Sequence, residues 1–582
     1  MIKLTLNGQP VALFPDTKIG ITAMNPYFNE IGAFSYPFTI PYIPNMGILQ
    51  HAARIQNVTR SFIWDAILFV DGIQILSGEA IAEGDVVDGA FPIVLRSAKT
   101  SFIKLTESLK MQDLDWGIEN TNNMSEWDVR AMRSGTINGT CEYSNYVCAP
   151  LFNNAAWTEQ EGRWFTSDYI NKYDPATGLL IGSTGDRSNT TTYNFYVRYI
   201  LKRIIEFLGL TLENDDMSTI TDLNRWFLLS LNNAWGTYST HYKYAFPILN
   251  VRDFLKVMRE FGIVIITNDR LKTASIKLVR DVINTQIISS LLNDHALKDV
   301  PVMTTPADGY TIGYKDASEA IITTTIADYV ITVANYAAIP PPGIQTRSNI
   351  YFCTSSGRYY STVLQKKADK ADPDVYSWKN IGNYRPLVSG KGEQANDINV
   401  TVVDQRLESI SVTKSIVVIV QSVPQTITKT WNIDIEMPEF NQKMNNFYEI
   451  WYSGSKYEEP PLVFLFNWGL RTYVNTEDSR VTVTYPVVSG DAYGCDEALK
   501  GNISMRSTGE KSIITQLVKD EADWKIRRKS KRQFFNLSII EYANFNWGEI
   551  QNISSINYLV NSLKFDIGKN GISPVEADLY TV

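Results

Sequence analysis

The sharpest charge feature of the chain is the run Lys525–Arg532, KIRRKSKR, in which six of eight residues are cationic. Such a run can contact phosphate or an acidic partner, or it can form a solvated turn before a strand. No aromatic residue interrupts it, which argues against a stacking platform for single-stranded nucleic acid. DNA binding through this run would require an affinity that falls steeply with salt. Lys525, Arg527 and Arg528 are retained as candidate interface residues.

Residue patterns for catalysis are absent. The sequence has no G-x-S-x-G elbow, no P-loop and no G-x-G-x-x-G turn. Asp215–Asp216 and Glu458–Glu459 are adjacent carboxylates, but glycosidase chemistry needs two carboxylates at a set separation across a cleft. We therefore interpret them as solvated loop charges. The expectation is a protein that is not an enzyme, with no catalytic residues and no cofactor.

Sulfur and imidazole ligands are also sparse. The four cysteines form no C-x-x-C pair, and the three histidines belong to no H-E-x-x-H motif, so a metal site is not expected. Cys141 and Cys148 are close enough in sequence for a local disulfide, although free thiols are the favoured interpretation. The residues are Cys141, Cys148, Cys353, Cys495, His51, His241 and His295.

Aromatic residues are the one compositional excess. They make up 12% of the 582 residues, with 31 Tyr and 13 Trp. Aromatic side chains favour strands and interfaces, and clusters of them can also stack on sugar rings. A carbohydrate-binding or carbohydrate-active protein is therefore the alternative function. Its candidate platforms are Trp157, Trp164 and Tyr169, and Tyr359, Tyr360 and Trp378.

Length and charge set broad limits. At about 150 residues per domain, the chain should hold three to five domains. Its net charge of −8 offers no general attraction to nucleic acid; DNA would at most pass through a lumen. The N-terminal sequence has the pattern of a strand and turn rather than a signal peptide, and no apolar run reaches the length of about 18 residues typical of a membrane helix. We expect synthesis and assembly in a cytoplasm and no membrane insertion.

The element around which these features are organised is the stretch Phe34–Asn45, FSYPFTIPYIPN. Strict alternation predicts a strand with Phe34, Tyr36, Phe38 and Ile40 on one face. Two prolines remove backbone donors from the same long side, so the strand should lie at a sheet edge or pair on one side only. A bare aromatic edge is an aggregation liability, so its own chain or a neighbouring subunit should cover it. These four residues are candidate interface residues, and Asn45 is a candidate cap of a following helix.

The remaining pattern is mainly β with α+β portions. Helices are expected at Tyr196–Leu208, Val251–Phe261, Phe440–Trp451 and Lys511–Trp524. Strands are expected at Ile2–Leu6, Phe62–Val70, Ile73–Ile81, Ala90–Arg96, Ile263–Thr267, Ala274–Val279, Glu408–Gln421, Gln425–Glu436, Phe534–Tyr542, Tyr558–Ile567 and Val575–Tyr580.

These elements suggest five units. Residues 1–100 form an N-terminal β-barrel or sandwich, 101–195 an irregular insertion, and 196–335 an α+β helix–hairpin domain. Residues 336–400 form an aromatic-rich β-module. Residues 401–582 form a C-terminal β-rich domain with two helical stretches. The long strand Gln425–Glu436 is a second candidate seam between subunits.

The order of several segments resembles tail proteins of tailed bacteriophages and prophages. The segments are SYPFTIP with its Pro-x-Asn ending, YVRYILKRIIEFLGL, NVRDFLKVMREFGIVIITNDRLKTASIKLV and INYLVNSLKFDIGKNGISPVEADLYTV. The chain is similar to the baseplate-hub and tail-tip family over a third to a half of its length. Each segment is a packing or turn pattern, and none carries catalytic residues.

The resemblance implies a structural role in the virion tail. It implies a homo-oligomeric ring, a trimer, at the distal end of the tail tube, with tail-tube, tape-measure and tail-tip proteins as partners. Ring closure would use heterologous contacts, in which the same two surfaces meet around an axis. The segments at 110–195 and 340–400 lie outside the resemblance and could contact another tail protein or the host.

Overall fold

The fold is taken from a computed structural model of the full chain. It describes residues 1–30, 32–50, 62–97, 106–120, 124–153, 169–181, 191–230, 232–233, 239–268, 271–300, 309–314, 331–334, 338, 350–353, 358–365, 375–383, 387–390, 394–398, 400, 404–439, 445–446, 462–475, 478–492, 499–506, 509–569 and 571–582.

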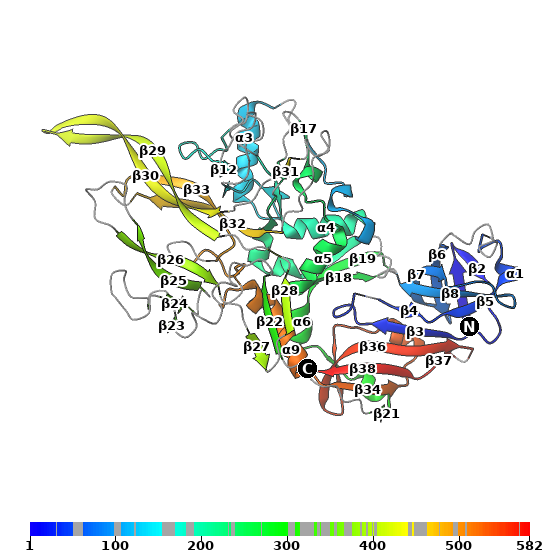
Figure 1. Ribbon diagram of the computed structural model, residues 1–582. Helices are drawn as coiled ribbons and strands as arrows, with labels where there is room; N and C mark the ends of the chain where they lie inside the picture. The colour runs from blue at the N-terminus through cyan, green and yellow to red at the C-terminus, as the bar shows by residue number, and fades with distance from the viewer. Residues whose placement is uncertain are drawn as a thin grey trace.

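The largest sheet joins the two ends of the chain. Its main path runs β2-β1-β6-β7-β8-β4-β3-β36-β38-β34-β21, and four short strands attach beside it. Figure 1 shows the N-terminal strands at the right, with β36, β38 and β34 beneath β3. The strands are β1 (Ile2–Leu6), β2 (Gln9–Val11), β3 (Ile19–Met24), β4 (Phe34–Ser35), β5 (Phe38–Pro41), β6 (Ile63–Val70), β7 (Ile73–Ala82), β8 (Ala90–Ser97), β20 (Ile288–Ser289), β21 (Ala296–Val300), β34 (Ser530–Phe535), β35 (Ile550–Ile553), β36 (Ile556–Gly568), β37 (Gly571–Ile572) and β38 (Val575–Thr581).

This sheet is open. Strand β3 pairs with β4 on one side and with the C-terminal strand β36 on the other, so the N-terminal strands continue into a longer sheet instead of closing on themselves. Among the described residues no sheet forms a closed barrel, and the barrel form of the N-terminal prediction is wrong. The mainly β character is confirmed.

A buried asparagine ties the two chain ends together beside this sheet. Asn25, which is fully buried, donates its Nδ2 to the carbonyl oxygens of Val560 (2.6 Å) and Trp547 (3.2 Å). Its Oδ1 accepts from the backbone N–H of Tyr27. Because a buried amide must be hydrogen-bonded to avoid a desolvation cost, these contacts fix the turn after β3 against the C-terminal strands.

The organising stretch is two short strands, not one. β4 pairs with both β3 and β8, whereas β5 pairs only with β8 among the described strands. One-sided pairing is therefore confirmed for Phe38–Pro41. The single alternating face is wrong, because the break at Tyr36–Pro37 shifts its phase: Ser35 is buried, and its Oγ accepts from the backbone N–H of Leu95.

Asn45 is the last residue of α1 (Tyr42–Asn45), not the cap of a following helix. Its side chain bonds the N–H and carbonyl of Ala12 and the carbonyl of Pro41. The buried Asn45 side chain makes three hydrogen bonds to two chain segments, and these bonds use the groups with which it could have capped a helix.

The helix–hairpin unit lies in the middle of the molecule, and its elements are confirmed. α4 (Val197–Phe207) and α5 (Val251–Glu260) bury their apolar stripes in the largest core cluster. β18 (Ile263–Asn268) and β19 (Thr273–Leu278) form the hairpin, and β14 (Thr211–Asp215) pairs parallel to β19. Asn250 precedes α5 without a side-chain cap bond. Gly262, at φ +74°, ends that helix where an added Cβ would lie 2.9 Å from the Leu517 carbonyl oxygen.

The C-terminal helical stretch begins as a π-helix, Ile514–Val518, and continues as α9 (Lys519–Arg527). The strand predicted at Phe534–Tyr542 is wrong beyond Phe535. β34 ends at Phe535, and α10 (Ile539–Ala543) begins after Ser538. Ser538 and Glu541 form a capping box, in which each side chain accepts the other's backbone N–H. The S-x-x-E spacing of Ser538 and Glu541 is the sequence pattern that indicates this helix start.

Smaller sheets complete the chain. They contain β9 (Ile118–Asn120), β10 (Tyr146–Val147), β11 (Leu151–Phe152), β12 (Tyr169–Ile170), β13 (Asn194–Phe195), β15 (Trp226–Leu228), β16 (Asn232–Asn233), β17 (Ser239–His241), β22 (Gly309–Tyr314), β23 (Ile331–Val333), β24 (Ile350–Cys353), β25 (Arg358–Gln365), β26 (Val375–Asn383), β27 (Leu387–Gly390), β28 (Gln394–Ile398), β29 (Asp404–Val420), β30 (Val423–Glu439), β31 (Asn445–Asn446), β32 (Phe464–Val474) and β33 (Thr482–Ser489). In the described part of the chain, the other α-helices are α3 (Glu126–Gly135), α6 (Val279–Ile283) and α7 (Leu291–Asp294), and short 3-10 helices lie at Met111–Asp113, Thr136–Asn138, Asp216–Thr219, Thr221–Arg225 and Tyr242–Ala245. The helix expected at Phe440–Trp451 lies outside the described residues except for β31.

Candidate interaction surface

The most exposed regular element is the hairpin of β29 and β30. Its two strands of 17 residues each pair antiparallel from Asp404–Glu439 to Val420–Val423. The turn is Gln421–Ser422, with φ of 49° and 63°. Two successive positive φ values define the type I′ turn, whose twist matches that of a β-hairpin. Both long strands were predicted.

The base of the hairpin is anchored in the largest core. Val412, Trp431, Ile433 and Ile435 are all buried there. Lys414 donates its Nζ to the Thr482 carbonyl oxygen at 2.8 Å. Alternate residues of β30 therefore hold the base as in any half-buried strand.

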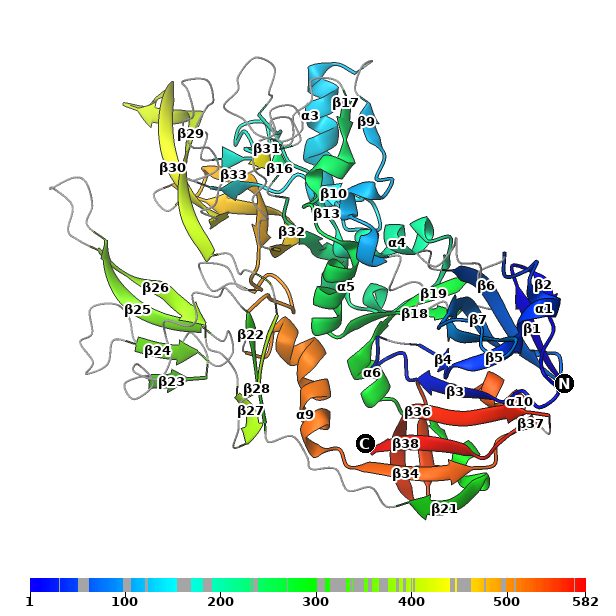
Figure 2. The same ribbon diagram turned by 45° about the vertical axis from the view of Figure 1, so that its right-hand side comes forward.

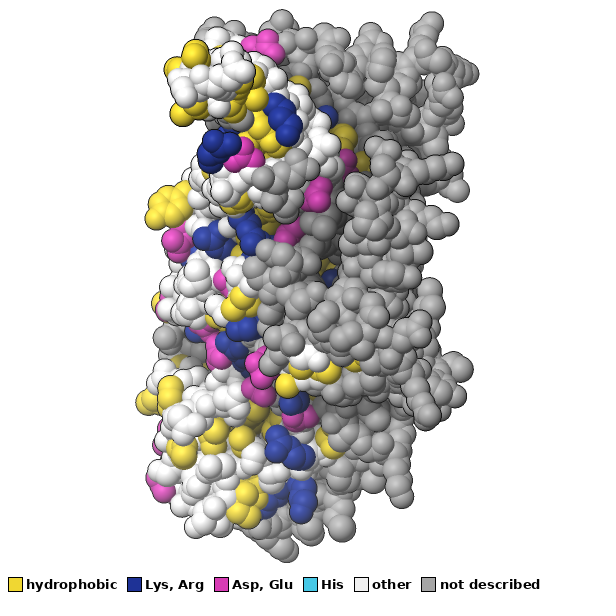
Figure 3. Space-filling view, turned by 90° about the vertical axis from the view of Figure 1, so that its left-hand side faces the viewer, with side chains coloured by type: hydrophobic (Ala, Val, Ile, Leu, Met, Phe, Trp, Pro, Cys, Tyr) yellow, Lys and Arg dark blue, Asp and Glu magenta, His cyan; other side chains and the backbone are white. Residues whose placement is uncertain are grey.

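Beyond this base the hairpin projects from the molecule, on the side opposite the N-terminal strands (Figures 1 and 2). We call residues Ser415–Thr428 the hairpin tip. Val417 is 60% exposed and Ile419 is 76% exposed. Val420, Val423 and Ile427 are exposed too. Seen from the side to which the hairpin points, apolar side chains gather at the top of the face (Figure 3).

The tip contains no charged residue, from SIVVIV through QSVPQTIT. Directly opposed residues share a face, so Thr413–Thr430 (2.8 Å) and Ser415–Thr428 (2.9 Å) make a short ladder of hydroxyl pairs towards the base. Apolar residues follow on both faces nearer the turn. Exposed contiguous apolar surface of this kind is typical of interaction sites.

The four aromatic and apolar interface candidates of the N-terminal stretch are distributed unevenly. Phe38 and Ile40 lie in the core of the large sheet, so the chain covers them itself. Phe34 is half-buried, with its ring 6.2 Å from that of Tyr36. Tyr36 is exposed and is the member of this set that a neighbour can reach.

The basic run spans the end of α9 and the start of β34. Lys525 pairs with Glu521 at 2.8 Å. The Arg528 guanidinium lies 4.0 Å from the ring centroid of Tyr580, a cation–π contact. Arg527 is exposed, and its Nε donates to the Asp523 carbonyl oxygen. The structure therefore uses two of the three predicted cations inside the chain and presents Arg527 outward.

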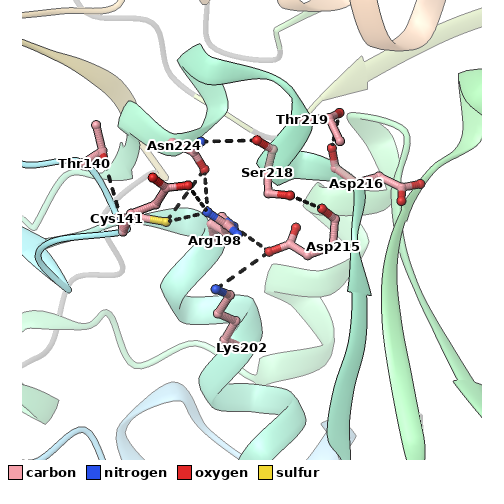
Figure 4. Close-up of polar contacts among 10 residues, drawn as sticks. Thr140, Cys141, Arg198, Lys202, Asp215, Asp216, Ser218, Thr219 and Asn224 are labelled. Atoms are coloured by element: carbon pink, nitrogen blue, oxygen red, sulfur yellow. Dashed lines mark hydrogen bonds and ion pairs between the residues drawn. The ribbon is translucent and has the colours of Figure 1, made fainter.

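A buried polar cluster surrounds Arg198 on α4 (Figure 4). Its Nε bonds Asp215 at the end of β14, and its Nη1 donates to Asn224 Oδ1 at 2.8 Å. The Cys141 sulfur lies 3.6 Å from the same Nη1. Burial raises the pKa of the Cys141 thiol, and the opposing charge of Arg198 does not reverse the shift. The thiol is therefore neutral near pH 7, and the cluster ties α4 to β14.

A second buried cluster is built on Glu119. The carboxylate accepts from Arg133 and from the hydroxyls of Tyr193 (2.7 Å) and Tyr146 (3.2 Å). Burial raises the pKa of the nearby Cys148 thiol to about 12. Cys141 and Cys148 are both free thiols, as favoured from the sequence. These groups satisfy one another, and no reactive nucleophile results.

Metal-ligating side chains do not gather among the residues that the structure describes. Within them no group of three or more His, Cys, Asp or Glu side chains could hold a metal ion. No helix in the described part is long and apolar enough to cross a membrane. Trp157 and Trp164 lie outside the described residues, as do the side chains of Tyr359, Tyr360 and Trp378. The Tyr169 hydroxyl bonds Glu408 at the base of the hairpin.

A solved structure that is similar to this chain is that of a prophage tail protein. No protein-family profile and no curated protein sequence matches the chain. The crystal structure of the 43 kDa tail protein of prophage MuSo2 from Shewanella oneidensis aligns over 100% of this chain and 97% of its own, with 8% identity and a TM-score of 0.33. A likeness at that TM-score does not by itself assign a fold or a function.

Proposed function

We propose that this chain is a structural component of a bacteriophage tail and that it works by assembling with copies of itself rather than by catalysis. The observation that carries the self-assembly is the uncharged, solvent-exposed hairpin tip. The assignment to a tail rests on the sequence resemblance described above. In its finer form, the proposal is a baseplate-hub or tail-tip ring between tail tube and distal tip, located in the virion tail.

A lone chain leaves the apolar surface of the hairpin tip uncovered. The hairpin tip has apolar side chains on both faces. Covering them with another surface lowers the free energy by about 25 cal/mol per Å² of apolar area buried. Monomeric soluble proteins rarely expose such a contiguous patch. The net charge of −8 suits a component that DNA passes without binding.

The proposal is tested by measuring the mass of the purified chain and of a double variant in solution. The wild type should form a discrete oligomer at micromolar concentration. Val417→Asp with Ile419→Asp should shift the chain to monomer, because two carboxylates at the tip would have to be desolvated in the contact. Mass photometry over a dilution series reads both results.

The matched control lies at the opposite end of the molecule. Ile43 is 77% exposed and Val87 is 66% exposed, close to the values of the two tip residues. Ile43→Asp with Val87→Asp should leave the oligomer intact. A wild type that stays monomeric, both alone and with its tail-tube protein, and that is absent from purified tails would refute the proposed function.

A further inference from the structure

The hairpin tip leaves two backbone edges open as well as its side chains. A two-residue type I′ turn closes on a hydrogen-bonded pair, here Val420–Val423, and hydrogen-bonded and non-hydrogen-bonded pairs then alternate along an antiparallel ladder. Every second residue therefore points its N–H and C=O away from the hairpin. On β29 these are Thr413, Ser415, Val417 and Ile419. On β30 they are Pro424, Thr426, Thr428 and Thr430.

No described strand uses either edge at the tip. β29 pairs only with β30, and β30 meets β11 only at its base, through Phe152 and Glu439. Natural proteins blunt open edges with charges, prolines or bulges. The β29 edge of the tip carries none of these. The β30 edge carries one, Pro424, which removes the single outward donor nearest the turn.

The outer edges of β29 and β30 run in opposite directions, so the edge of one strand can pair with the edge of the other in a neighbouring copy. When two hairpins lie side by side and point the same way, the β29 edge of one is antiparallel to the β30 edge of the next. Both edges present outward groups at every second residue, which is the spacing that a shared ladder needs. The contact is heterologous, so its repetition gives a ring when the rotation between copies closes and an open filament when it does not.

We propose that neighbouring copies of this chain are joined by strand pairing, with the outer edge of β29 in one copy hydrogen-bonded to the outer edge of β30 in the next. This inference rests on the proposed function, since it names the seam of the assembly. The occupant is a second copy because the chain itself presents both open edges, and the β29 edge of one copy matches the antiparallel β30 edge of another over the uncharged residues Ser415–Thr428. Pro424 sets one limit of the seam, which begins at Thr426 on the β30 side.

Amide hydrogen exchange on the wild-type chain tests the seam directly. Outward amides exchange quickly in a monomer and slowly once they donate to a neighbour. On going from dilute monomer to assembly, peptides covering 413–419 and 426–430 should both gain protection. If only the peptide covering 413–419 gained protection, the inference would be overturned. The β29 edge would then pair with a foreign strand or with the β29 edge of a second copy. Protection of neither peptide, in a chain that does assemble, would also overturn the inference.

Proline substitutions provide the second measurement. Val417→Pro and Thr426→Pro each remove an outward donor and spare the ladder inside the hairpin. Each should weaken assembly by on the order of tenfold or more. Val417→Ile, which keeps the donor, the β-branched shape and the apolar character, should assemble like the wild type. Thermal unfolding of the dilute monomers shows whether each variant remains folded.

The outcomes separate this inference from the proposed function. A wild type that never assembles defeats both. A wild type that assembles while the folded Val417→Pro and Thr426→Pro variants do so equally well defeats the strand-pairing seam alone. If Val417→Pro abolished assembly and Thr426→Pro did not, the strand-pairing seam would also be rejected, because the outer edge of β30 would then not take part in the contact.

Discussion

Strands β36 and β29 are both long and rich in apolar residues, yet they differ in how many strands flank them and in how far their apolar side chains are buried. β36 pairs with β3 on one side and with β38 on the other, and its inward residues are fully or nearly fully buried. β29 has one partner, and its distal apolar residues face solvent. The apolar content of a strand therefore does not say whether its own chain covers it. The neighbours that the topology supplies decide that.

The difference separates stability from assembly. In the large sheet, β3 and β36 pair with each other although they come from opposite ends of the chain, and the apolar area that they bury stabilises the fold. At the hairpin tip the same kind of residue contributes little to the fold and is available for contact. Substitutions in the two regions should consequently affect different measurements.

The largest effect on stability is expected in β36. Leu563 is fully buried in the core of the large sheet. Leu563→Ala should lower the free energy of unfolding by about 3 kcal/mol, through lost transfer energy and the cavity left behind. Urea unfolding followed by circular dichroism measures the change. A loss below about 1 kcal/mol would mean that this strand is not the covered element that the comparison requires.

The next effect concerns the ion pair that holds α9 against α5. Glu521 accepts two hydrogen bonds from Arg259, at 2.6 and 2.9 Å. Burial alone would raise the pKa of Glu521, but Arg259 and Lys525 outweigh it and lower the pKa to about 2. The folded-state pKa thus lies below the ordinary value of 4.5, so the stabilisation is complete above about pH 4.5 and is lost as the pH falls towards 2.

Glu521→Gln should therefore lower the free energy of unfolding by about 3 kcal/mol at pH 7, because it leaves Arg259 partly uncompensated in a buried site. The gap between variant and wild type should narrow between pH 4.5 and 3. Urea unfolding at several pH values measures it. Asp523→Asn, on the same helix, is the control and should change the free energy of unfolding at pH 7 by no more than about 0.5 kcal/mol. A gap that stays constant down to pH 3 would contradict the assigned pKa shift.

Much of the secondary structure could be predicted because local patterns dominate it. The apolar spacing of α4 and α5 and the alternation of β36 and β38 are readable residue by residue. The pairing of β3 with β36, which lie at opposite ends of the chain, has no local signal. The prediction of an N-terminal β-barrel or sandwich over residues 1–100 therefore did not include β36, and its barrel form is wrong. Phe38 and Ile40 alternate as predicted and pack in the core of the same sheet, so their own chain rather than a neighbouring subunit covers them.

The candidate site shows the same division. The two long strands were predicted, and the β30 segment was named as a possible seam. The exposure of Val417 and Ile419 was not foreseen, because SIVVIV is as consistent with a buried strand as with a bare one. One signal was present: the 14 residues of the tip carry no charge and contain a proline in only one strand. An open edge with a single blocking residue has that composition.

The smallest expected effect on stability sharpens the comparison most. Ile419→Thr removes apolar surface at a residue that is 76% exposed, and threonine keeps the β-branched shape that suits a strand. The free energy of unfolding of the dilute monomer should change by no more than about 0.5 kcal/mol. Assembly should weaken, because the lost apolar area lies in the contact. Parallel urea unfolding and mass measurements on this variant and on Leu563→Ala test the separation. If Ile419→Thr destabilised the monomer as much as the core substitution, the tip would belong to the fold, and its apolar residues would need no second copy to explain them.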